Sequence, residues 1–391
     1  MMRILGMISG TSHDGIDIAA VDFHHDGGDL TGQLVHAGSQ PYDPDLRAAL
    51  IAMLPPASTD LAAVCELDTR IGQAFAAAAA GAIAAAGPVD AICSHGQTVY
   101  HWVEGDRALG TLQLGQPAWI AERTGVPVVA DIRARDLTVS GQGAPLASLI
   151  DHLLLKGRPG RPGALNLGGI SNLTVVADRT SAWDIGPANA LVDAVVVDRG
   201  LNPLGYDADA AIAGGGRVDK ALLAAFLAEP YYRLEPPKST GKELFNLAYV
   251  ERAIAASGRC PSDADLLATL VELTAETVAD AVRAAGVTSL AASGGGCRNP
   301  LLMRRLRELL PGVEVTLTDA LGLPADTKEA VLMALIGWCT LHGLPGVVPG
   351  GTGSTEPRIL GSITPGRGPL ALPEPVAELT SLRLLPAEGG R

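Results

Sequence analysis

The sequence has few aromatic residues and no excess of positive charge. Phenylalanine, tryptophan and tyrosine make up 4% of the 391 residues, and the net charge is −13 because 42 acidic residues outnumber 29 basic ones. Surfaces that bind nucleic acid are usually basic, often with aromatic residues between the basic ones. We therefore expect no nonspecific binding to nucleic acid.

Cysteine is also scarce. The five cysteines are scattered along the chain, odd in number, and form no C-x-x-C pair. This pattern predicts neither a zinc site nor a disulfide framework. Reduced, structural thiols are typical of cytoplasmic proteins, so we expect a cytoplasmic location.

No hydrophobic run is long enough to cross a bilayer. The longest, Ala74–Ala86, has 13 residues, whereas a membrane helix needs about 20. Near the start, Gly6 and the Ser9–Gly10 pair interrupt any hydrophobic leader, so we expect no signal peptide. With 47% apolar residues and a mean hydropathy of +0.25, the chain is long enough for two domains with separate cores.

The beginning of the chain combines two apolar strands with a polar turn. Residues 4–8 and 16–23 predict a β-hairpin, and the turn between them reads G-T-S-H-D-G. Its glycines allow positive φ angles, and such a loop can direct backbone N–H groups and hydroxyls toward a phosphate. Asp14 and Asp17 are suited to hold magnesium, directly or through water. The alternative is an ordinary hairpin turn.

A second hairpin of the same kind is predicted about 160 residues later. Residues 164–176 read A-L-N-L-G-G-I-S-N-L-T-V-V, a short apolar strand, a glycine turn and a β-branched strand. Two such hairpins suggest a duplicated architecture with one phosphate loop from each half.

Three later segments carry candidate chemistry. Asp184 precedes Gly186–Pro187 and a helix predicted near Asn189, so a loop at a helix N-terminus is expected to hold it, and helix capping is the alternative. Glu329 poses the same choice in the first turn of a predicted helix over 330–342. The glycines at 294–296 follow a short strand and permit either the approach of a flat ligand or a tight strand–helix turn.

Polar side chains also follow predicted strands in the first half of the chain. The run 95–98 comes after a strand over 91–94, and Arg133 after a strand over 126–130. Functional side chains often project from strand ends. His95 and His101 are alternatively hydrogen-bonded structural residues, and Arg133 is either a surface ion-pair residue or a sugar contact beside 141–145. The segment 236–243 lacks the glycine spacing and the strand–loop–helix setting of a P-loop, so we exclude that motif.

Nine blocks spread in order over residues 3 to about 366 resemble the anhydro-N-acetylmuramic acid kinases. The most distinctive are G-T-S-H-D-G-I-D at 10–17 and W-D-I-G-P-A-N-A-L-V-D-A at 183–194. The full set is Gly10–Asp17, Ser94–His101, Gln113–Arg133, Gly141–Leu146, Asn166–Thr174, Trp183–Ala194, Pro236–Asn246, Ser293–Met303 and Pro324–Ala330.

This resemblance implies an α/β protein with a two-lobe, actin/hexokinase-like ATPase fold, a duplicated core and an interlobe cleft for ATP. We expect the first lobe to comprise residues 1–131 with about 366–391, and the second lobe residues 132–365.

The implied activity is that of an ATP-dependent kinase in cell-wall recycling. It opens 1,6-anhydro-N-acetylmuramic acid with water and phosphorylates O6, giving N-acetylmuramic acid 6-phosphate. The alternatives are a kinase of another anhydrosugar, such as levoglucosan, and a non-enzymatic actin-like ATP-binding protein. We expect ATP and Mg²⁺ as cofactors, a small-molecule anhydrosugar as partner, and neither nucleic acid nor membrane. The oligomeric state stays open, with a homodimer as one option.

The resemblance also assigns residues. Asp184 matches the catalytic base. The expected ATP-binding residues are Gly10, Thr11, Ser12, His13, Asp14, Gly15, Ile16, Asp17, Gly168, Gly169, Asn172, Gly294, Gly295 and Gly296. The expected sugar-binding residues are Gln97, Thr98, Arg133, Gly143, Ala144 and Asn189, and the expected magnesium residues are Asp14 and Glu329. The chain departs from the family pattern at His13 for leucine, Ile132 for phenylalanine, Ile185 for threonine and Ala188 for glycine.

Overall fold

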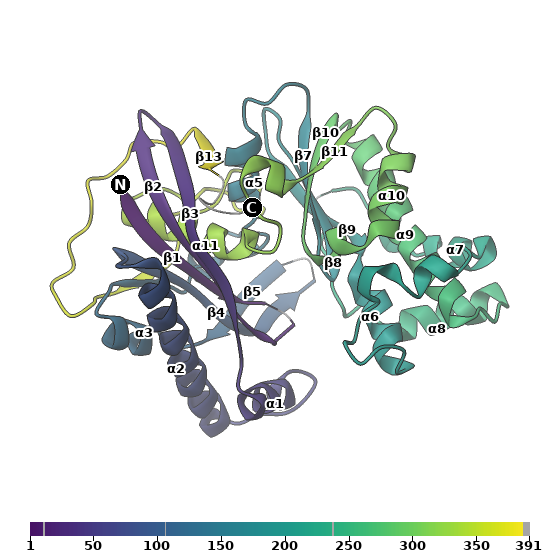
Figure 1. Ribbon diagram of the computed structural model, residues 1–391, viewed down its shortest axis with the longest axis horizontal. Coiled ribbons are helices and arrows are strands. Elements are labelled where there is room, and N and C mark those ends of the chain that lie inside the picture. Colours follow the sequence, from purple (N-terminus) through teal and green to yellow (C-terminus); the bar gives the residue numbers. More distant parts are fainter. Residues whose placement is uncertain (11, 106, 237, 386–391) are drawn as a thin grey trace. The chain divides into compact units, whose positions relative to one another are not determined.

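The computed structural model describes residues 1–10, 12–105, 107–236 and 238–385. The chain divides into two compact units (Figure 1). Unit 1 comprises Met1–Lys156, Leu321–Leu323 and Thr327–Arg391, and unit 2 comprises Gly157–Ala320 and Pro324–Asp326. Each unit is described by itself.

This division differs from the boundaries expected at residues 131 and 365. Helices α5 (Ser148–Leu155) and α11 (Lys328–Leu341) place buried residues such as Leu149 and Leu335 in the core of unit 1. Strand β12 (Ser362–Thr364) pairs with β6 (Val128–Ala130) in the sheet of the same unit. Residues 132–156 and 327–365 therefore belong to unit 1, because burial and strand pairing decide the boundary rather than the end of one strand.

The sheet of unit 1 is built on the predicted N-terminal hairpin. Strands β1 (Met2–Ser9), β2 (Gly15–Asp26) and β3 (Asp29–Pro41) are consecutive and antiparallel. Strand β4 (Ala91–Glu104) runs parallel to β1, and β6 runs parallel to β4. The sheet order is β12-β6-β4-β1-β2-β3-β13, with β5 (Arg107–Leu114) paired to β4 and β13 (Ser381–Leu385) at one edge.

Helices cover both faces of this sheet (Figure 1). Side chains alternate across a strand, so Leu5 and Met7 of β1 join the cluster that contains α2 (Leu61–Ala86), whereas Ile4 joins the cluster that contains α11. Gly6 lies on the α11 side, where a Cβ atom would overlap the backbone of Ala330. This close approach fixes the start of α11 against the middle of β1.

The sheet of unit 2 repeats the same topology. Strands β7 (Pro162–Leu167), β8 (Ile170–Val175) and β9 (Ser181–Pro187) form an antiparallel meander. Strand β10 (Ser289–Ser293) runs parallel to β7, and β11 (Glu314–Leu317) runs parallel to β10. The order β11-β10-β7-β8-β9 matches β6-β4-β1-β2-β3 of unit 1. The predicted α/β class with a duplicated core is confirmed.

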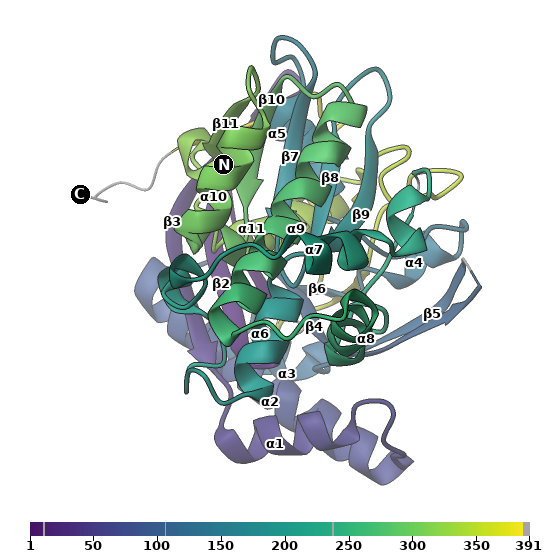
Figure 2. The same ribbon diagram turned by 90° about the vertical axis from the view of Figure 1, so that its right-hand side faces the viewer.

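The helices of unit 2 pack with its sheet into one hydrophobic core (Figure 2). They are α6 (Asn189–Asp198), α7 (Lys220–Leu227), α8 (Leu247–Ser257), α9 (Asp263–Ala284) and α10 (Pro300–Leu309). Helix α9 is buried along most of its length, and the hydroxyl of Thr274 donates to the carbonyl oxygen of Pro187, 3.0 Å away, at the end of β9. This contact ties α9 to the strand that carries Asp184.

Shorter helices complete the described chain. In unit 1 these are α1 (Pro44–Met53), α3 (Pro117–Thr124) and α4 (Ala134–Leu137). Single 3₁₀ turns cover Ala208–Ala210, Ala213–Gly215, Pro230–Arg233, Gly295–Arg298 and Thr318–Leu321.

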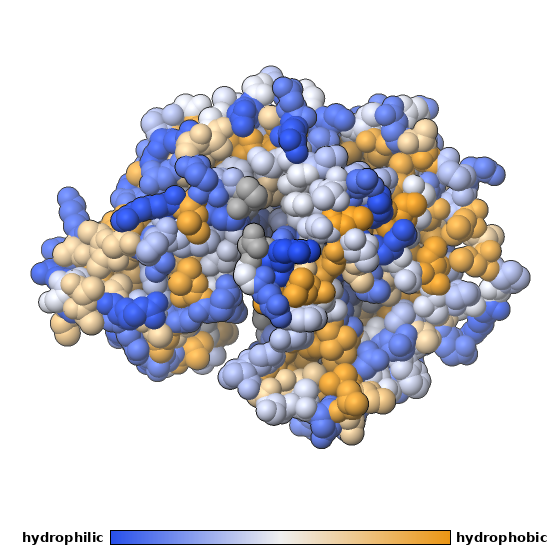
Figure 3. Space-filling view, turned by 180° about the vertical axis from the view of Figure 1, so that it is seen from behind, coloured by the Kyte–Doolittle hydropathy of each residue, from blue (hydrophilic) through white to orange (hydrophobic). Residues whose placement is uncertain are grey.

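The surface mixes polar and apolar side chains. Figure 3 shows hydrophobic side chains in small groups between hydrophilic ones on one face. In unit 1, the hairpin of β4 and β5 carries the exposed apolar residues Tyr100, Trp102, Val103, Leu109 and Leu112. In the part of the chain that the structure describes, no helix combines the length and apolar character needed to cross a membrane.

Candidate active site

The loop between β1 and β2 is held in place by its neighbours in unit 1. His13 has a φ of 53°, in the left-handed region, and its N–H donates to the carbonyl oxygen of Gly10 at 3.3 Å. Arg47 Nε donates to the carbonyl oxygen of His13 at 2.9 Å. The hydroxyl of Ser12 donates to Asp14 Oδ1 at 2.7 Å. The loop is thus a defined turn that exposes Asp14, while Thr11 lies outside the described residues.

Gln97 holds the loop between β1 and β2 through hydrogen bonds. Its Oε1 accepts a hydrogen bond from Ser9 Oγ at 2.6 Å, and its Nε2 donates to the carbonyl oxygens of Gly10 and Thr98 at 3.2 and 3.1 Å. The side chain is fully buried. We therefore reassign Gln97 from sugar contact to loop support. The side chain of Ile16 is also buried, in the core beside α2, and is not available to ATP.

Arg133 is bonded to two groups of the same unit. Its Nε donates to His95 Nε2 at 2.8 Å, and Nη1 donates to the carbonyl oxygen of Gly143 at 2.6 Å. His95 Nδ1 lies 2.9 Å from the carbonyl oxygen of Gly96, so the imidazole is neutral with its proton on Nδ1. Burial and the Arg133 charge lower the pKa of His95 to about 3. His95 is thus the hydrogen-bonded structural residue of the alternative interpretation, and it orients Arg133.

The turn that contains Gly143 and Ala144 is fixed by a residue the sequence did not single out. Asp136 is fully buried, and its carboxylate accepts from the N–H of Gly143 and the hydroxyl of Thr352, both at 2.8 Å. Burial raises the pKa of Asp136, and these hydrogen bonds oppose the rise. The hydroxyl of Thr98, another expected sugar contact, accepts a hydrogen bond from Gln113 Nε2 at 3.1 Å.

Glu329 lies in the first turn of α11, as expected. The residue is exposed, but the protein that surrounds its carboxyl group raises the pKa of that group. Asp17 raises the pKa further, while Arg133 and Lys328 lower it. Asp17, rather than Asp14, is therefore the carboxylate that acts on Glu329. Among the described residues, no group of three or more His, Cys, Asp or Glu side chains is arranged to hold a metal ion. A magnesium site here would consequently need ligands from a substrate or water.

In unit 2, the Gly168–Gly169 turn joins β7 to β8 and is bonded to the start of α6. The N–H groups of Ala188 and Ala190 donate to the carbonyl oxygen of Gly169 at 2.9 and 3.0 Å. The N–H of Asn189 donates to the carbonyl oxygen of Gly168 at 3.0 Å. These bonds fix the turn and bring Asn189 beside it.

The glycines at 294–296 lie against the end of β7. Gly294 has a φ of 89°, and a Cβ there would lie 2.7 Å from Asn166 Oδ1. A Cβ on Gly296 would lie 2.7 Å from Leu167 Cβ. Packing of the protein itself therefore requires these two glycines, which favours the tight strand–helix turn. Gly295 is the exposed member of the three.

Asp184 lies in β9 and not on a loop at a helix N-terminus, so the capping role does not apply. It is half-buried and paired in register with Asn172 of β8. Its Oδ2 accepts hydrogen bonds from Ser239 Oγ at 2.8 Å and from the N–H of Thr240 at 3.1 Å. Tyr231 donates its hydroxyl to the carbonyl oxygen of Asp184 at 2.7 Å. Backbone and side chain of Asp184 are both fixed.

The other carboxylate oxygen of Asp184 remains available. Within the described part of the chain, Oδ1 accepts no hydrogen bond. Burial raises the pKa of Asp184, Thr240 and Ser239 lower it, and Glu243 raises it. A half-buried carboxylate with one oxygen held and one open is arranged to accept a proton.

Ser239, Thr240 and Lys242 are the functional candidates that sequence reasoning missed. All three lie in Pro236–Asn246, one of the blocks that resemble the family, to which the sequence analysis assigned no functional residue. Lys242 lies beside the glycine turn, because its Cε is 3.6 Å from the position of a Cβ on Gly169. Lys242 also lowers the pKa of Asp193, which burial raises to about 6. The signal available in the sequence was the block itself, in which Ser239, Thr240, Lys242 and Glu243 lie within five consecutive positions.

Three of the four departures from the family pattern are buried in hydrophobic cores. Ile185 and Ala188 belong to the core of unit 2, and Ile132 to that of unit 1. Because side chains alternate along a strand, Ile185 points away from the face that carries Asp184. His13 is the departure that lies in a candidate loop.

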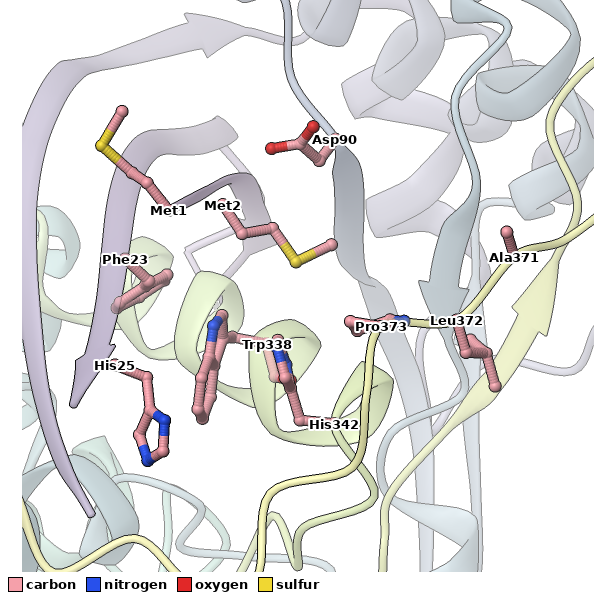
Figure 4. A pocket seen from close by; sticks show the side chains of 10 residues that line it. All are labelled: Met1, Met2, Phe23, His25, Asp90, Trp338, His342, Ala371, Leu372 and Pro373. Carbon is pink, nitrogen blue, oxygen red and sulfur yellow. The ribbon is translucent and has the colours of Figure 1, made fainter. Parts of the chain in front are cut away.

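A separate cavity in unit 1 lies at the start of β1, whereas the loop between β1 and β2 follows the end of that strand. It has a volume of about 550 Å³ and is lined by Met1, Met2, Phe23, His25, Asp90, Trp338, His342, Ala371, Leu372 and Pro373 (Figure 4). The rings of Trp338 and His342 stack with centroids 4.0 Å apart. None of the expected site residues lines this cavity, so it is distinct from the candidate active site.

The two sequence comparisons with known proteins agree on one family. The family model described as anhydro-N-acetylmuramic acid kinase matches residues 2–366. A protein of that name from Streptomyces coelicolor is 52% identical over 381 residues, covering 96% of this chain and 97% of that protein. A namesake from Streptomyces avermitilis is 53% identical over 386 residues, covering 98% of this chain and 100% of that protein.

Among solved structures, the ROK hexokinase from Thermus thermophilus is similar with a TM-score of 0.36 and 16% identity, over 86% of this chain and all of that one. The sequence matches carry the assignment: the chain belongs to the anhydro-N-acetylmuramic acid kinase family.

Proposed function

We propose that this protein is an ATP-dependent kinase that opens 1,6-anhydro-N-acetylmuramic acid with water and phosphorylates O6. Family membership supports the reaction, and the observation that carries it on this chain is Asp184, whose Oδ2 is held by Ser239 and Thr240. A fixed carboxylate with one open oxygen is what activation of water requires.

In the proposed reaction, opening of the anhydro ring produces the O6 nucleophile that phosphoryl transfer needs. Asp184 takes a proton from water as the water oxygen bonds to the anomeric carbon, as in inverting glycoside hydrolysis. The bond from the anomeric carbon to O6 breaks, and its electron pair stays on O6. O6 then bonds to the γ-phosphorus, the bond to the β–γ bridging oxygen breaks, and ADP leaves. Because O6 bonds to phosphorus, its departure from the anomeric carbon needs no acid, and the proton on Asp184 passes to solvent.

Phosphate binding is proposed for the glycine turns. Gly168 and Gly169 are fixed by α6, and exposed Lys242 beside Gly169 adds positive charge. The loop Gly10–Asp14 of unit 1 remains a proposed phosphate-binding loop. Arginine and backbone groups suit sugar hydroxyls and carboxylates, so Arg133, Gly143 and Asn189 remain proposed sugar contacts.

Magnesium is proposed to be held by Asp17 and Glu329, with Asp14 acting through water. The observation that fits a cation is the raised pKa of the Glu329 carboxyl, to which nearby Asp17 contributes, because a divalent ion would offset this repulsion. Bound Mg²⁺ would neutralise phosphate charge during transfer. The cytoplasmic location and the option of a homodimer stay predictions.

A substrate panel tests the proposed function. ADP formation is measured with 1,6-anhydro-N-acetylmuramic acid, levoglucosan, glucose and N-acetylglucosamine, with and without Mg²⁺. We expect turnover with the first sugar and Mg²⁺, and little ADP formation without sugar, since kinases commonly complete their site only around the acceptor. Preference for glucose would contradict an anhydrosugar kinase, and rapid ATP hydrolysis without any sugar would favour an ATPase.

Isotope labelling tests the order of bond formation. In ¹⁸O-labelled water, we expect the label on the anomeric carbon and none in the phosphate group, because water attacks the sugar and O6 attacks phosphorus. Mass spectrometry of the product and its fragments locates the label. Label in the phosphate would mean that water attacks ATP, and the coupled ring opening would be wrong.

A further inference from the structure

The segment from Lys238 to Lys242 is anchored next to Asp184. Lys238 Nζ donates to the carbonyl oxygens of Tyr231 and Tyr232 at 3.2 and 3.4 Å and lies 4.8 Å from the centroid of the Tyr231 ring. The carbonyl oxygen of Lys238 accepts from the N–H of Asp184 at 3.1 Å. Backbone contact and a lysine anchor thus fix the segment before Ser239 is reached.

Both donors on the Asp184 carboxylate come from this segment, and both bind the same oxygen. Ser239 Oγ and the N–H of Thr240 meet Oδ2 at 2.8 and 3.1 Å. A carboxylate that rotates about its Cβ–Cγ bond exchanges its two oxygens. Two donors on one oxygen oppose that rotation and keep Oδ1 on the open side.

We propose that Ser239 is a positioning residue for the reaction, whose hydroxyl fixes the rotation of the Asp184 carboxylate so that Oδ1 faces the attacking water. The inference rests on the proposed function, in which Asp184 is the base. Ser239 itself is exposed and touches Asp184 through its side chain alone, whereas Thr240 acts through its backbone. Replacing Ser239 therefore removes one donor and leaves the other.

The hydrogen bond from Ser239 to Asp184 also affects the pKa of Asp184. Burial raises the pKa of Asp184, and the Ser239 hydroxyl opposes this by bonding to the charged form. Lys238, in the same segment, directs its ammonium group to the carbonyl oxygens of Tyr231 and Tyr232. Among the described residues, Glu243 raises the pKa of Asp184, and Tyr231 has its own pKa raised by burial and by Asp184. Neither changes when Ser239 is replaced, so loss of the hydroxyl should raise the pKa of Asp184.

Kinetics of Ser239→Ala test the proposal. We expect kcat to fall roughly 10- to 100-fold, the range for a lost hydrogen bond to a charged group. KM for ATP and for the sugar should stay nearly unchanged, and the acid limb of the kcat profile should move to higher pH. Ser239→Thr keeps a hydroxyl and should recover most of kcat. Ser257→Ala is the matched control, because among the described residues that hydroxyl bonds to the carbonyl oxygen of Ile254 and the N–H of Arg259, at the end of α8.

A titration independent of turnover separates this inference from the proposed function. The carboxyl carbon of Asp184, assigned by comparison with Asp184→Asn, is followed by ¹³C NMR against pH in the full chain. We expect its midpoint at higher pH in Ser239→Ala than in the wild type. An unchanged midpoint together with an unchanged kcat would overturn the role of Ser239. A wild type inactive on the anhydrosugar, with a shifted midpoint, would overturn the proposed function alone.

Discussion

Two influences oppose one another at the carboxylate of Asp184. Burial in β9 disfavours the charged form and raises its pKa, while hydrogen bonds from Thr240 and Ser239 favour the charged form. The first makes Asp184 a stronger base than an exposed aspartate, and the second keeps it ionised and oriented. A base used near neutral pH needs both.

Asp184→Asn is the direct test at this scale. We expect kcat to fall about 10²- to 10⁴-fold, the usual contribution of a general base, because an amide cannot accept the proton from water. Binding of ATP and sugar should be largely kept. In the wild type the acid limb of activity should lie above the ordinary range of an aspartate, since the pKa of Asp184 is raised and the ionised form is the active one.

Asp178→Asn serves as the matched control for that measurement. Asp178 is exposed in the turn between β8 and β9, six positions from Asp184 in the same unit. Its replacement should leave kcat unchanged. Near-normal turnover in Asp184→Asn, measured by ADP formation at saturating substrates, would show that this carboxylate has only a structural role.

At the scale of elements, α11 links a candidate magnesium residue to a buried ion pair. Glu329 and Lys328 are neighbours at the start of the helix. Lys328 Nζ lies 2.6 Å from Asp151 Oδ1 of α5, and the two side chains are 5% and 4% exposed. The pair fixes the N-terminal end of α11 against α5, and so fixes the backbone that carries Glu329.

Lys328→Met should destabilise unit 1 by about 3–5 kcal/mol, because it removes the ammonium group that compensates the buried Asp151 charge. The free energy of unfolding, from urea denaturation followed by circular dichroism, measures this. The double variant Lys328→Met/Asp151→Leu should recover most of the loss, since both charges are then gone.

Arg70→Met is the control for removal of a surface ion pair. Arg70 pairs with Glu66 one turn away on α2, and the two side chains are 35% and 67% exposed, so the loss should be about 0.5 kcal/mol or less. Equal effects of Lys328→Met and Arg70→Met would mean that the buried pair does not stabilise α11.

At the scale of the whole molecule, each unit has hydrophobic clusters of its own. The cluster of unit 2 runs from Leu165 to Leu310 and draws on no residue of unit 1. The clusters of unit 1 depend on residues distant in sequence, because Ile4 of β1 packs with Trp338 of α11. Unit 2 is therefore nearly continuous in the chain, whereas unit 1 needs both ends.

We expect a fragment of residues 157–326 to fold by itself, because its core is complete. Trp183, which is 8% exposed, is the one tryptophan in that fragment. A blue-shifted emission that moves red in one cooperative urea transition would show folding.

A fragment of residues 1–156 is the matched comparison. It lacks α11 and should not form a cooperative structure, since one face of its sheet would lose the helix that covers it. A broad, non-cooperative transition in 157–326, or a cooperative one in 1–156, would contradict the independence of unit 2.

Local patterns in the sequence predicted the elements that carry the candidate site. Apolar strands on either side of glycine turns predicted both hairpins. The motif blocks predicted the family and a duplicated core, and they placed Glu329 in the first turn of α11. These properties depend on residues close together in the chain, where spacing and side-chain type are sufficient.

Tertiary structure decided what depends on residues far apart. Ser239 meets Asp184 across 55 positions, and Gln97 meets Ser9 across 88, which turns an expected sugar contact into a buried support. The pairing of β12 with β6 moved the unit boundary. No local pattern encodes such contacts, because each follows from how complete sheets and helices bury their apolar faces and satisfy the polar groups that are buried with them.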